Sequence, residues 1–470
     1  MNYKKRMLRT TAIYFAGQMS TRFLSILLLP LYTKYIDTAA YGYFDIVQTY
    51  LNVAVPFFFF EVWSAVLRFT LEKEEQEEKS TIITNSFFVS FIGFFLFTLA
   101  FWIVTGVITL EHSGLIYAYA ISWMLQLMMM GVCRGLLDNF SYAISGAIGV
   151  IVVSGISLLG IFYFKWGIET LFISNIVSYL LQSLFLAFRV RINRYIIPKY
   201  FNKNILKDLF RFCIPLSINT IFYWLLSSIN RVIIVQYLGY SANGIYSVAN
   251  KLGNIITAFV AIFMLSWQEI VFCLKYDETN EIQQIYDAEF RNIKVLLGLA
   301  VLCLLPITNF FFNIIIGEGY FEAFNLIPLL YFMVFLTSVN SFIEVVFSAV
   351  HETKKMLYVK VVGGITNVAI IFLLIHTVGL FASPIAMICA QGVSMFLNCY
   401  LLREHVRIKL GFQYLMVFCT VYILGAWIYY TQSRMVNILW LLIIGAFAVY
   451  YMKDMIKQII IAISARFQSR

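Results

Sequence analysis

The sequence predicts an all-α polytopic membrane protein with about 14 transmembrane helices. Of its 470 residues, 61% are hydrophobic and only 12% are charged, whereas about 25% of the residues in an average soluble domain are charged. Apolar runs of about 20 residues, the length that crosses a bilayer as a helix, recur from one end of the chain to the other. These runs are too continuous for the alternating strands of an outer-membrane barrel.

Fourteen apolar segments account for the predicted spans. They cover residues 10–33, 44–70, 82–106, 113–133, 140–164, 170–189, 212–238, 244–272, 292–316, 323–350, 357–378, 383–402, 413–431 and 436–452. With the N-terminus in the cytoplasm, 27 of the 34 Lys and Arg fall in cytoplasmic segments or at the cytoplasmic ends of spans, and only 3 fall in outer loops. This asymmetry follows the positive-inside rule, so we expect both termini in the cytoplasm. It also explains the net charge of +10 without a nucleic-acid partner. The first apolar run contains Arg22 and is interpreted as a span, not as a removable signal peptide.

A basic, amphipathic stretch at 191–211 separates two groups of six spans. An internal repeat supports this division, because TKYIDTAAYGYFDIVQTYL (33–51) aligns with VQYLGYSANGIYSVANKLG (235–253) at a constant offset of 202 that matches Gly42 with Gly244. Each copy is expected to make a tight outer turn at its glycine, and both copies have the same orientation in the membrane. The predicted domains are a six-helix lobe at 1–190, a cytoplasmic linker at 191–211, a second six-helix lobe at 212–403, and two further helices with a cytoplasmic tail at 404–470.

Four cations lie inside the apolar segments: Arg22, Arg68, Arg231 and Lys251. On insertion scales each would cost roughly 2.5–3.5 kcal/mol at the centre of a spanning helix. Cations at this depth are expected to face a water-filled cavity between helices, and a cationic cavity favours an anionic cargo. Repeats of this kind favour alternating access around a central site.

Amide side chains share helical faces with these cations, and we expect them to line the same cavity. They are Gln18 in the first span, Asn219 in the seventh, and Asn250 and Asn254 in the eighth. Amide groups both donate and accept hydrogen bonds, so they suit sugar hydroxyls.

Four carboxylates also lie in or near the spans: Asp45, Glu61, Glu269 and Glu344. Two roles remain open for them. They can neutralise the cations, because a paired charge is much cheaper to bury than a lone one. They can also carry a coupled H⁺ or Na⁺ between two states of a transport cycle.

The sequence carries no enzyme signature. It has no Walker A motif, its seven cysteines form no CxxC pair, and its four histidines are widely separated near the ends of spans. We therefore expect no catalytic centre, no bound metal and no cofactor.

Three groups of residues resemble a known family. The run LLLPLYTKYIDTAAYGYFDIV followed by Pro56 and AVLRF (65–69), and the segment IIIGEGYFEAFNLIPLL (314–330), are similar to polysaccharide transporters of the multidrug/oligosaccharidyl-lipid/polysaccharide (MOP) exporter superfamily. The resemblance implies flipping of an undecaprenyl-pyrophosphate-linked oligosaccharide across the bacterial inner membrane, in contact with membrane lipid and with polysaccharide polymerases as possible partners. It also implies cations in the first, second and eighth helices, where Arg22, Arg68 and Lys251 lie.

Three alternatives remain open. A cation-coupled multidrug exporter of the same fold would favour an acidic cavity, and a peptidoglycan-precursor flippase would be essential for growth. A membrane-bound polymerase or ligase would need a large outer loop, whereas the outer loops assigned here are all short.

Overall fold

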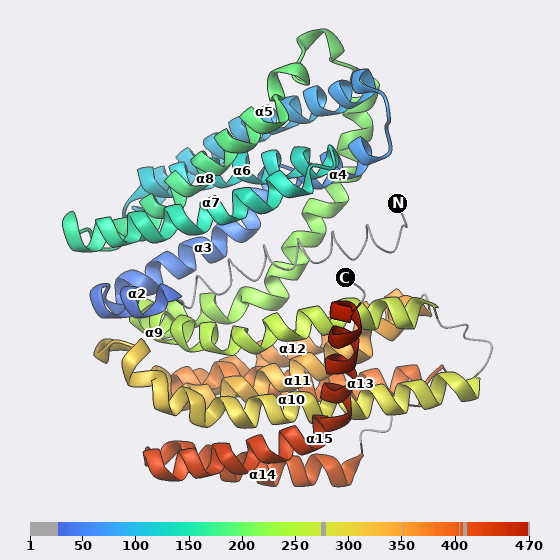
Figure 1. The fold of residues 1–470 in the computed structure, drawn as a ribbon. Helices are drawn as coiled ribbons and strands as arrows, with labels where there is room; N and C mark the ends of the chain where they lie inside the picture. The colour runs from blue at the N-terminus through green and yellow to red at the C-terminus, as the bar shows by residue number, and fades with distance from the viewer. Residues whose placement is uncertain (1–26, 274–278, 351, 404, 408–410, 469–470) are drawn as a thin grey trace. The chain divides into compact units, whose positions relative to one another are not determined.

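The computed structural model describes residues 27–273, 279–350, 352–403, 405–407 and 411–468 (Figure 1). Within these ranges the regular structure is entirely helical, which confirms the predicted all-α class. The α-helices are α2 (Leu29–Tyr35), α3 (Thr38–Phe58), α4 (Val62–Leu71), α5 (Gln76–Val107), α6 (Ser113–Gly135), α7 (Asn139–Leu158), α8 (Glu169–Val190), α9 (Lys203–Cys273), α10 (Thr279–Ile315), α11 (Ala323–Ala349), α12 (Thr353–Val378), α13 (Ala382–Leu402), α14 (Phe412–Tyr430) and α15 (Arg434–Gln468).

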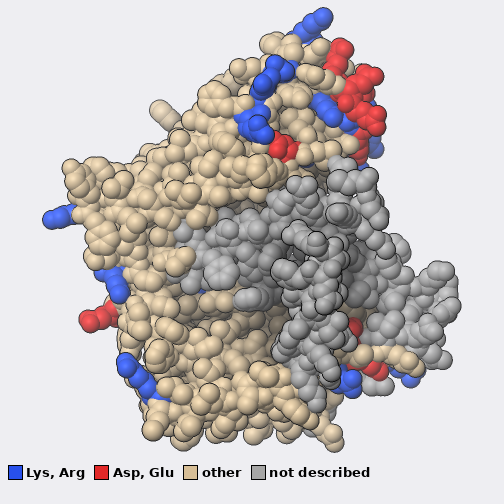
Figure 2. Space-filling view, viewed as in Figure 1, with Lys and Arg blue, Asp and Glu red and all other residues tan. Residues whose placement is uncertain are grey.

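The described helices have the length and composition of membrane spans. Among them, 9 helical stretches are long and apolar enough to cross a bilayer, or 10 if the bent pair α3 and α4 counts as one span. The first predicted span, 10–33, lies mostly outside the described residues. On the face shown in Figure 2, charged side chains gather toward the ends of helices and leave the flanks largely uncharged. This distribution is that of a polytopic membrane protein.

The chain divides into two units, Met1–Ser247 and Val248–Arg470. In the first unit α8 packs against α6 and α7, and α4 packs against α5 and α6. In the second unit α13 packs against α11 and α12, while α10 contacts α11, α14 and α15. The part of α9 before Val248 belongs with the first unit because α3 holds it, as described below. The six-helix lobes at 1–190 and 212–403 stay a prediction.

Small and polar residues set the packing inside the first unit. Helices in lipid gain no hydrophobic energy by touching one another, so close packing and hydrogen bonds decide which of them meet. A Cβ added at Gly131 of α6 would lie 2.7 Å from the Trp63 carbonyl oxygen of α4, so only glycine allows this approach. In the neighbouring pair, Ser178 Oγ of α8 donates to the Gly149 carbonyl of α7 at 3.2 Å.

The basic stretch predicted as a linker is fastened to α5. Thr84 Oγ1 donates to the Tyr195 carbonyl at 2.8 Å, and Asn85 Nδ2 donates to the Tyr200 carbonyl at 3.1 Å. Both donor side chains are buried. Because buried polar groups of α5 need these carbonyls as partners, this stretch is fixed to the first unit.

Candidate functional site

The second predicted span is broken. α3 ends at Phe58, α4 begins at Val62, and the two helices are bent by 51°. Pro56 lies in the last turn of α3, where it lacks the N–H that would continue the helical hydrogen bonds. The backbone then passes through left-handed conformations at Phe60 (φ 55°) and Glu61 (φ 48°), which are unfavourable for residues other than glycine. Strained backbone of this kind is concentrated at functional sites.

The Glu61 side chain is held at this break by two hydroxyl groups. Ser64 Oγ donates to Glu61 Oε1 at 3.2 Å, and Thr220 Oγ1 of α9 donates to Glu61 Oε2 at 2.9 Å. The carboxylate thus joins the broken span to α9 within the first unit. In transporters, broken helices at membrane depth are typical of ion and substrate sites.

Asp45 of α3 lies at the centre of a second polar group. Its Oδ1 accepts a hydrogen bond from Ser247 Oγ at 2.7 Å, and its Oδ2 accepts one from Asn243 Nδ2 at 3.2 Å. Arg231 Nε lies 3.3 Å from the same Oδ2. We call Asp45, Arg231, Asn243 and Ser247 the Asp45 cluster. It ties α3 to α9 through one carboxylate.

The ion pair in this cluster is largely withdrawn from solvent. The side chain of Arg231 is 25% exposed and that of Asp45 is 9% exposed. Arg231 Nη1 also donates to Thr49 Oγ1 at 3.4 Å, and Trp224 Nε1 donates to the Thr49 carbonyl at 2.6 Å. Removing one partner of such a pair leaves a poorly solvated charge, so the two residues depend on each other.

Next to the cluster, α3 and α9 touch backbone to backbone. A Cβ added at Gly42 would clash with the Tyr240 carbonyl oxygen, and a Cβ added at Gly244 would clash with the Thr38 carbonyl oxygen. We call this contact between Gly42 and Gly244 the glycine seam. Asn243 Nδ2 closes it with a hydrogen bond to the Gly42 carbonyl at 2.9 Å.

The seam follows the sequence repeat. At the offset of 202, Thr38 corresponds to Tyr240 and Gly42 to Gly244. Gly42 faces Tyr240, which lies four residues before Gly244. Gly244 faces Thr38, which lies four residues before Gly42. This reciprocal pattern is that of a pseudo-twofold contact. The outer turns predicted at the two glycines are wrong. The breaks lie at Asp37 and at Gly239 (φ 84°), which are also 202 residues apart, and the glycines lie inside helices because the seam needs their missing side chains.

Arg68, another predicted residue of the first unit, makes its contacts outside the Asp45 cluster. Arg68 is 59% exposed near the end of α4, where its Nε lies 3.3 Å from Glu72 Oε1 and its guanidinium lies over the ring of Phe212 at 4.8 Å. An exposed pair of this kind contributes little to stability. Asn219 is exposed on α9. Arg22 and Gln18 lie outside the described residues.

In the second unit, Glu344 has a cation of its own. Lys360 Nζ of α12 lies 2.6 Å from Glu344 Oε2, and the Glu344 side chain is 10% exposed. Lys251 and Asn250 are half-buried on α9, and Asn254 is exposed. The side chain of Glu269 lies outside the described part of the chain.

Sequence reasoning missed several partners of the predicted residues. Four of these partners were not singled out as site residues. Thr220 donates to Glu61, and Lys360 pairs with Glu344. Asp45 accepts hydrogen bonds from Asn243 and Ser247. One signal was available for the last of them, because Ser247 corresponds to Asp45 at the repeat offset of 202. Among the described residues no group of three or more His, Cys, Asp or Glu side chains could hold a metal ion.

The comparison with known protein families is decisive at this point. The profile of a family described as "Polysaccharide biosynthesis protein" matches residues 7–267, which is more than half of the chain. The chain belongs to this family. The match spans both the Asp45 cluster and the glycine seam, and it confirms the resemblance seen in the sequence. Curated protein sequences give no match to this polysaccharide biosynthesis protein.

Solved structures share the fold of this polysaccharide biosynthesis protein. The lipid II flippase MurJ, in an inward closed conformation, aligns with a TM-score of 0.68 and 15% identity over 95% of this chain and 100% of that one. A multidrug resistance MATE transporter of the MOP superfamily, in an inward-facing conformation, aligns with a TM-score of 0.62 and 18% identity over 82% of this chain and 95% of that one. At such identities the likeness shows the fold. The chain therefore shares its fold with a lipid II flippase and with a multidrug transporter.

Proposed function

We propose that the protein is a flippase for a polyprenyl-pyrophosphate-linked oligosaccharide repeat unit of capsule, O-antigen or teichoic-acid type. The observation that carries the proposal is Arg231, a cation kept at 25% side-chain exposure in an apolar segment of a polysaccharide biosynthesis protein. A pyrophosphate that crossed hydrocarbon alone would lose its hydration at prohibitive cost. A guanidinium replaces that hydration with charge-assisted hydrogen bonds.

The Asp45 cluster offers a way to couple cargo to movement. Arg231 is paired with Asp45, so an incoming pyrophosphate has to compete with that carboxylate. Once phosphate oxygens bind Arg231, their negative charge repels Asp45 and weakens its bonds to Asn243 and Ser247. Those bonds join α3 to α9 beside the glycine seam, so cargo binding favours opening of the seam. A ligand shifts a conformational equilibrium only through such differential contacts, and alternating access in this proposal depends on them.

We propose that the cargo also contacts the other predicted polar residues, each within its own unit. In this proposal Arg22 and Arg68 of the first unit and Lys251 of the second add positive charge, and Gln18, Asn219, Asn250 and Asn254 offer hydrogen bonds to sugar hydroxyls. An amide lining of this kind adapts to different sugars, because amide groups both donate and accept.

Glu61 is the carboxylate that we propose for coupling to H⁺ or Na⁺. It accepts hydrogen bonds from two hydroxyl groups, whereas Asp45 and Glu344 are each paired with a cation. Among the described residues its hydrogen-bond donors are neutral hydroxyls, so an H⁺ or Na⁺ that binds it need not displace a Lys or Arg side chain. Its position at a helix break lets that change alter the bend. Glu269 is a further candidate.

In the cell we propose a multi-pass protein of the bacterial inner membrane with both termini in the cytoplasm. Its partners are membrane lipid, the undecaprenyl-pyrophosphate-linked glycan and polysaccharide polymerases that receive the flipped unit, with no role for nucleic acid. The distribution of Lys and Arg along the chain supports this orientation.

Two other cargoes are compatible with the fold. The likeness to MATE transporters favours a cation-coupled multidrug exporter, and the likeness to MurJ favours a peptidoglycan precursor. A cationic drug gains nothing from Arg231, because like charges repel. Replacing Arg231 should therefore impair export of an anionic glycolipid much more than export of a cationic drug.

The test is deletion of the gene in its native host, with analysis of surface glycans and lipid-linked intermediates. Complementation uses the wild-type gene, Arg22→Ala, Arg231→Gln, and the control Arg189→Gln, whose side chain is 58% exposed at the end of α8. We expect loss of one surface polysaccharide, accumulation of its lipid-linked unit inside, and rescue by the wild type and the control only. Unchanged glycans with greater sensitivity to cationic drugs would favour the exporter, and arrest of growth would favour the peptidoglycan precursor.

A further inference from the structure

A cavity of about 620 Å³ with three charged residues in its lining lies between three helices of the second unit. Its lining is Asp287, Arg291, Lys294 and Val295 of α10, Gly411 and Tyr414 at the start of α14, and Tyr451 of α15. These residues lie at the ends of the apolar spans Tyr286–Ile315, Gln413–Tyr430 and Arg434–Tyr451. They fall at the ends that the predicted topology assigns to the cytoplasm, so the cavity is expected at the depth of lipid headgroups.

The lining of this cavity is positive. Lys294 is only 6% exposed, and its Nζ lies 4.3 Å from the ring centre of Phe290 and 5.2 Å from that of Tyr414. Arg291 is exposed at the same cavity. Asp287 is the one carboxylate in the lining and accepts a hydrogen bond from Gln283 Nε2 at 2.9 Å. Two cations against one carboxylate favour an anion.

The cavity is held together across the chain. Tyr414 Oη donates to the Lys294 carbonyl at 2.8 Å, which joins the start of α14 to α10. Gln283 makes two hydrogen bonds with the backbone of Arg407, at 2.7 Å and 2.9 Å, just before α14. The arrangement of cations and tyrosines is therefore built by tertiary contacts, and basic pockets of this kind between transmembrane helices bind lipid headgroups.

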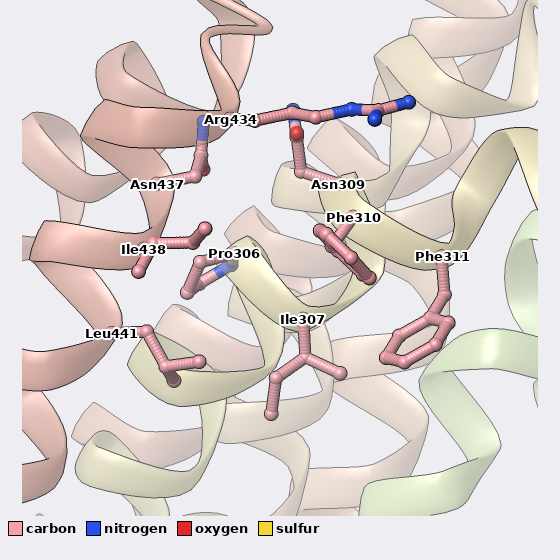
Figure 3. A pocket seen from close by; sticks show the side chains of 9 residues that line it. All are labelled: Pro306, Ile307, Asn309, Phe310, Phe311, Arg434, Asn437, Ile438 and Leu441. Carbon is pink, nitrogen blue, oxygen red and sulfur yellow. The ribbon is translucent and has the colours of Figure 1, made fainter.

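Two apolar hollows lie farther along α15, on faces other than that of Tyr451. One of about 650 Å³ is lined by Leu441, Leu442, Gly445, Ala446, Val449 and Tyr450, and its exposed side chains give it an outward-facing surface. The next, of about 240 Å³, lies between α15 and α10, and Figure 3 shows Ile438 and Leu441 facing Pro306 and Ile307 across it. Leu441 lines both cavities. From Tyr451 to Leu441 the helix rises roughly 15 Å, about half the hydrocarbon thickness of a bilayer.

We propose that α10, α14 and α15 bind an anionic phospholipid of the cytoplasmic leaflet. Arg291 and Lys294 bind its phosphodiester, and one acyl chain lies along the apolar cavities beside α15. A basic cavity at headgroup depth, on a helix that also carries apolar hollows toward the centre of the bilayer, favours a lipid over free phosphate, which would leave those hollows empty. This site does not depend on the proposed cargo of the transporter.

The test is native mass spectrometry of the delipidated, full-length protein in detergent. The probes are phosphatidylglycerol, phosphatidylethanolamine, inorganic phosphate and undecaprenyl phosphate. The variants are Arg291→Gln, the same change combined with Lys294→Met, and Gly445→Leu, whose added side chain has open space in the apolar hollow that Gly445 lines. The control is Arg403→Gln, a cation over the ring of Tyr400 at 4.4 Å that does not line the cavity.

We expect phosphatidylglycerol to bind in preference to the other probes. Loss of one cation should weaken its binding roughly 5-fold and loss of both roughly 25-fold. Gly445→Leu should also weaken it, and Arg403→Gln should leave it unchanged. Because Arg291 is exposed, its replacement tests the headgroup site even if the Lys294 variant does not fold. Equal binding of phosphatidylethanolamine, preference for inorganic phosphate or undecaprenyl phosphate, or an equal loss in the control would each overturn the assignment.

Discussion

The glycine seam allows a quantitative test of how α3 and α9 are joined. Gly42→Ala adds a methyl carbon that clashes with the Tyr240 carbonyl oxygen and lies 2.6 Å from the Gly244 backbone nitrogen, where ordinary van der Waals contact begins at 3.4 Å. The helices must therefore part by at least about 0.8 Å, which also weakens the hydrogen bond from Asn243 to the Gly42 carbonyl. Overpacking costs typically 1–3 kcal/mol, and the better helix propensity of alanine does not offset this cost, because residue 42 stays helical when the seam parts. The seam should be weakened by roughly 1–3 kcal/mol, a 5- to 150-fold shift in the equilibrium between the closed and the parted seam.

The assay is disulfide formation across the seam in native membranes. Thr38 and Ser241 are hydrogen-bonded through their hydroxyls, so Thr38→Cys with Ser241→Cys places two thiols at the contact. Adding Gly42→Ala should slow disulfide formation at least several-fold and up to about 150-fold. The matched control is Gly155→Ala in α7, where an added Cβ meets nothing within 4 Å. Equal rates with and without Gly42→Ala would refute the seam as a close contact.

Three further predictions concern the neighbouring contacts. Asp45→Asn removes the carboxylate that pairs with Arg231. Because a quarter of the Arg231 side chain is exposed, the loss of stability in thermal unfolding should be roughly 1–2 kcal/mol. Adding Arg231→Gln should recover part of this loss, and additive losses would contradict the pairing. Glu61→Gln removes the carboxylate at the helix break. Transport by the reconstituted protein should then lose its dependence on pH or Na⁺, while thermal stability is kept. An unchanged dependence would exclude Glu61 as the coupling residue. Asn85→Ala removes two hydrogen bonds between α5 and residues 200–202, and limited proteolysis should then cleave this stretch several-fold faster than in the wild type, unless other contacts hold it in place.

Much of the architecture could be predicted from the sequence because the bilayer acts on each segment separately. Apolar length and the position of Lys and Arg decide which segments span and in which direction, and neither depends on what the segment touches. The repeat at 33–51 and 235–253 was visible for the same reason, since it is a property of the chain. The four cations inside apolar segments could likewise be identified from the sequence alone.

The role of the repeated glycines could not be predicted from the sequence. A glycine beside polar residues serves either a turn that needs positive φ or a close approach of two backbones, and the sequence is the same in both cases. The structure uses Gly239 for the turn, and Gly42 and Gly244 for the approach. The bend after Pro56 was similarly open, because a proline inside a span is either a tolerated kink or a break. The left-handed backbone at Phe60 and Glu61 made it a break.

Hydropathy and charge thus determined the class, the spans and the candidate residues, whereas tertiary structure decided which of them meet. Asp45 and Arg231 lie far apart in the chain, and their contact depends on the depth and rotation of α3 and α9 in the seam. Depth and rotation follow from packing between helices, where small residues and hydrogen bonds replace the hydrophobic effect. These forces leave little trace in a single sequence, because any helix with the same apolar composition crosses the bilayer equally well.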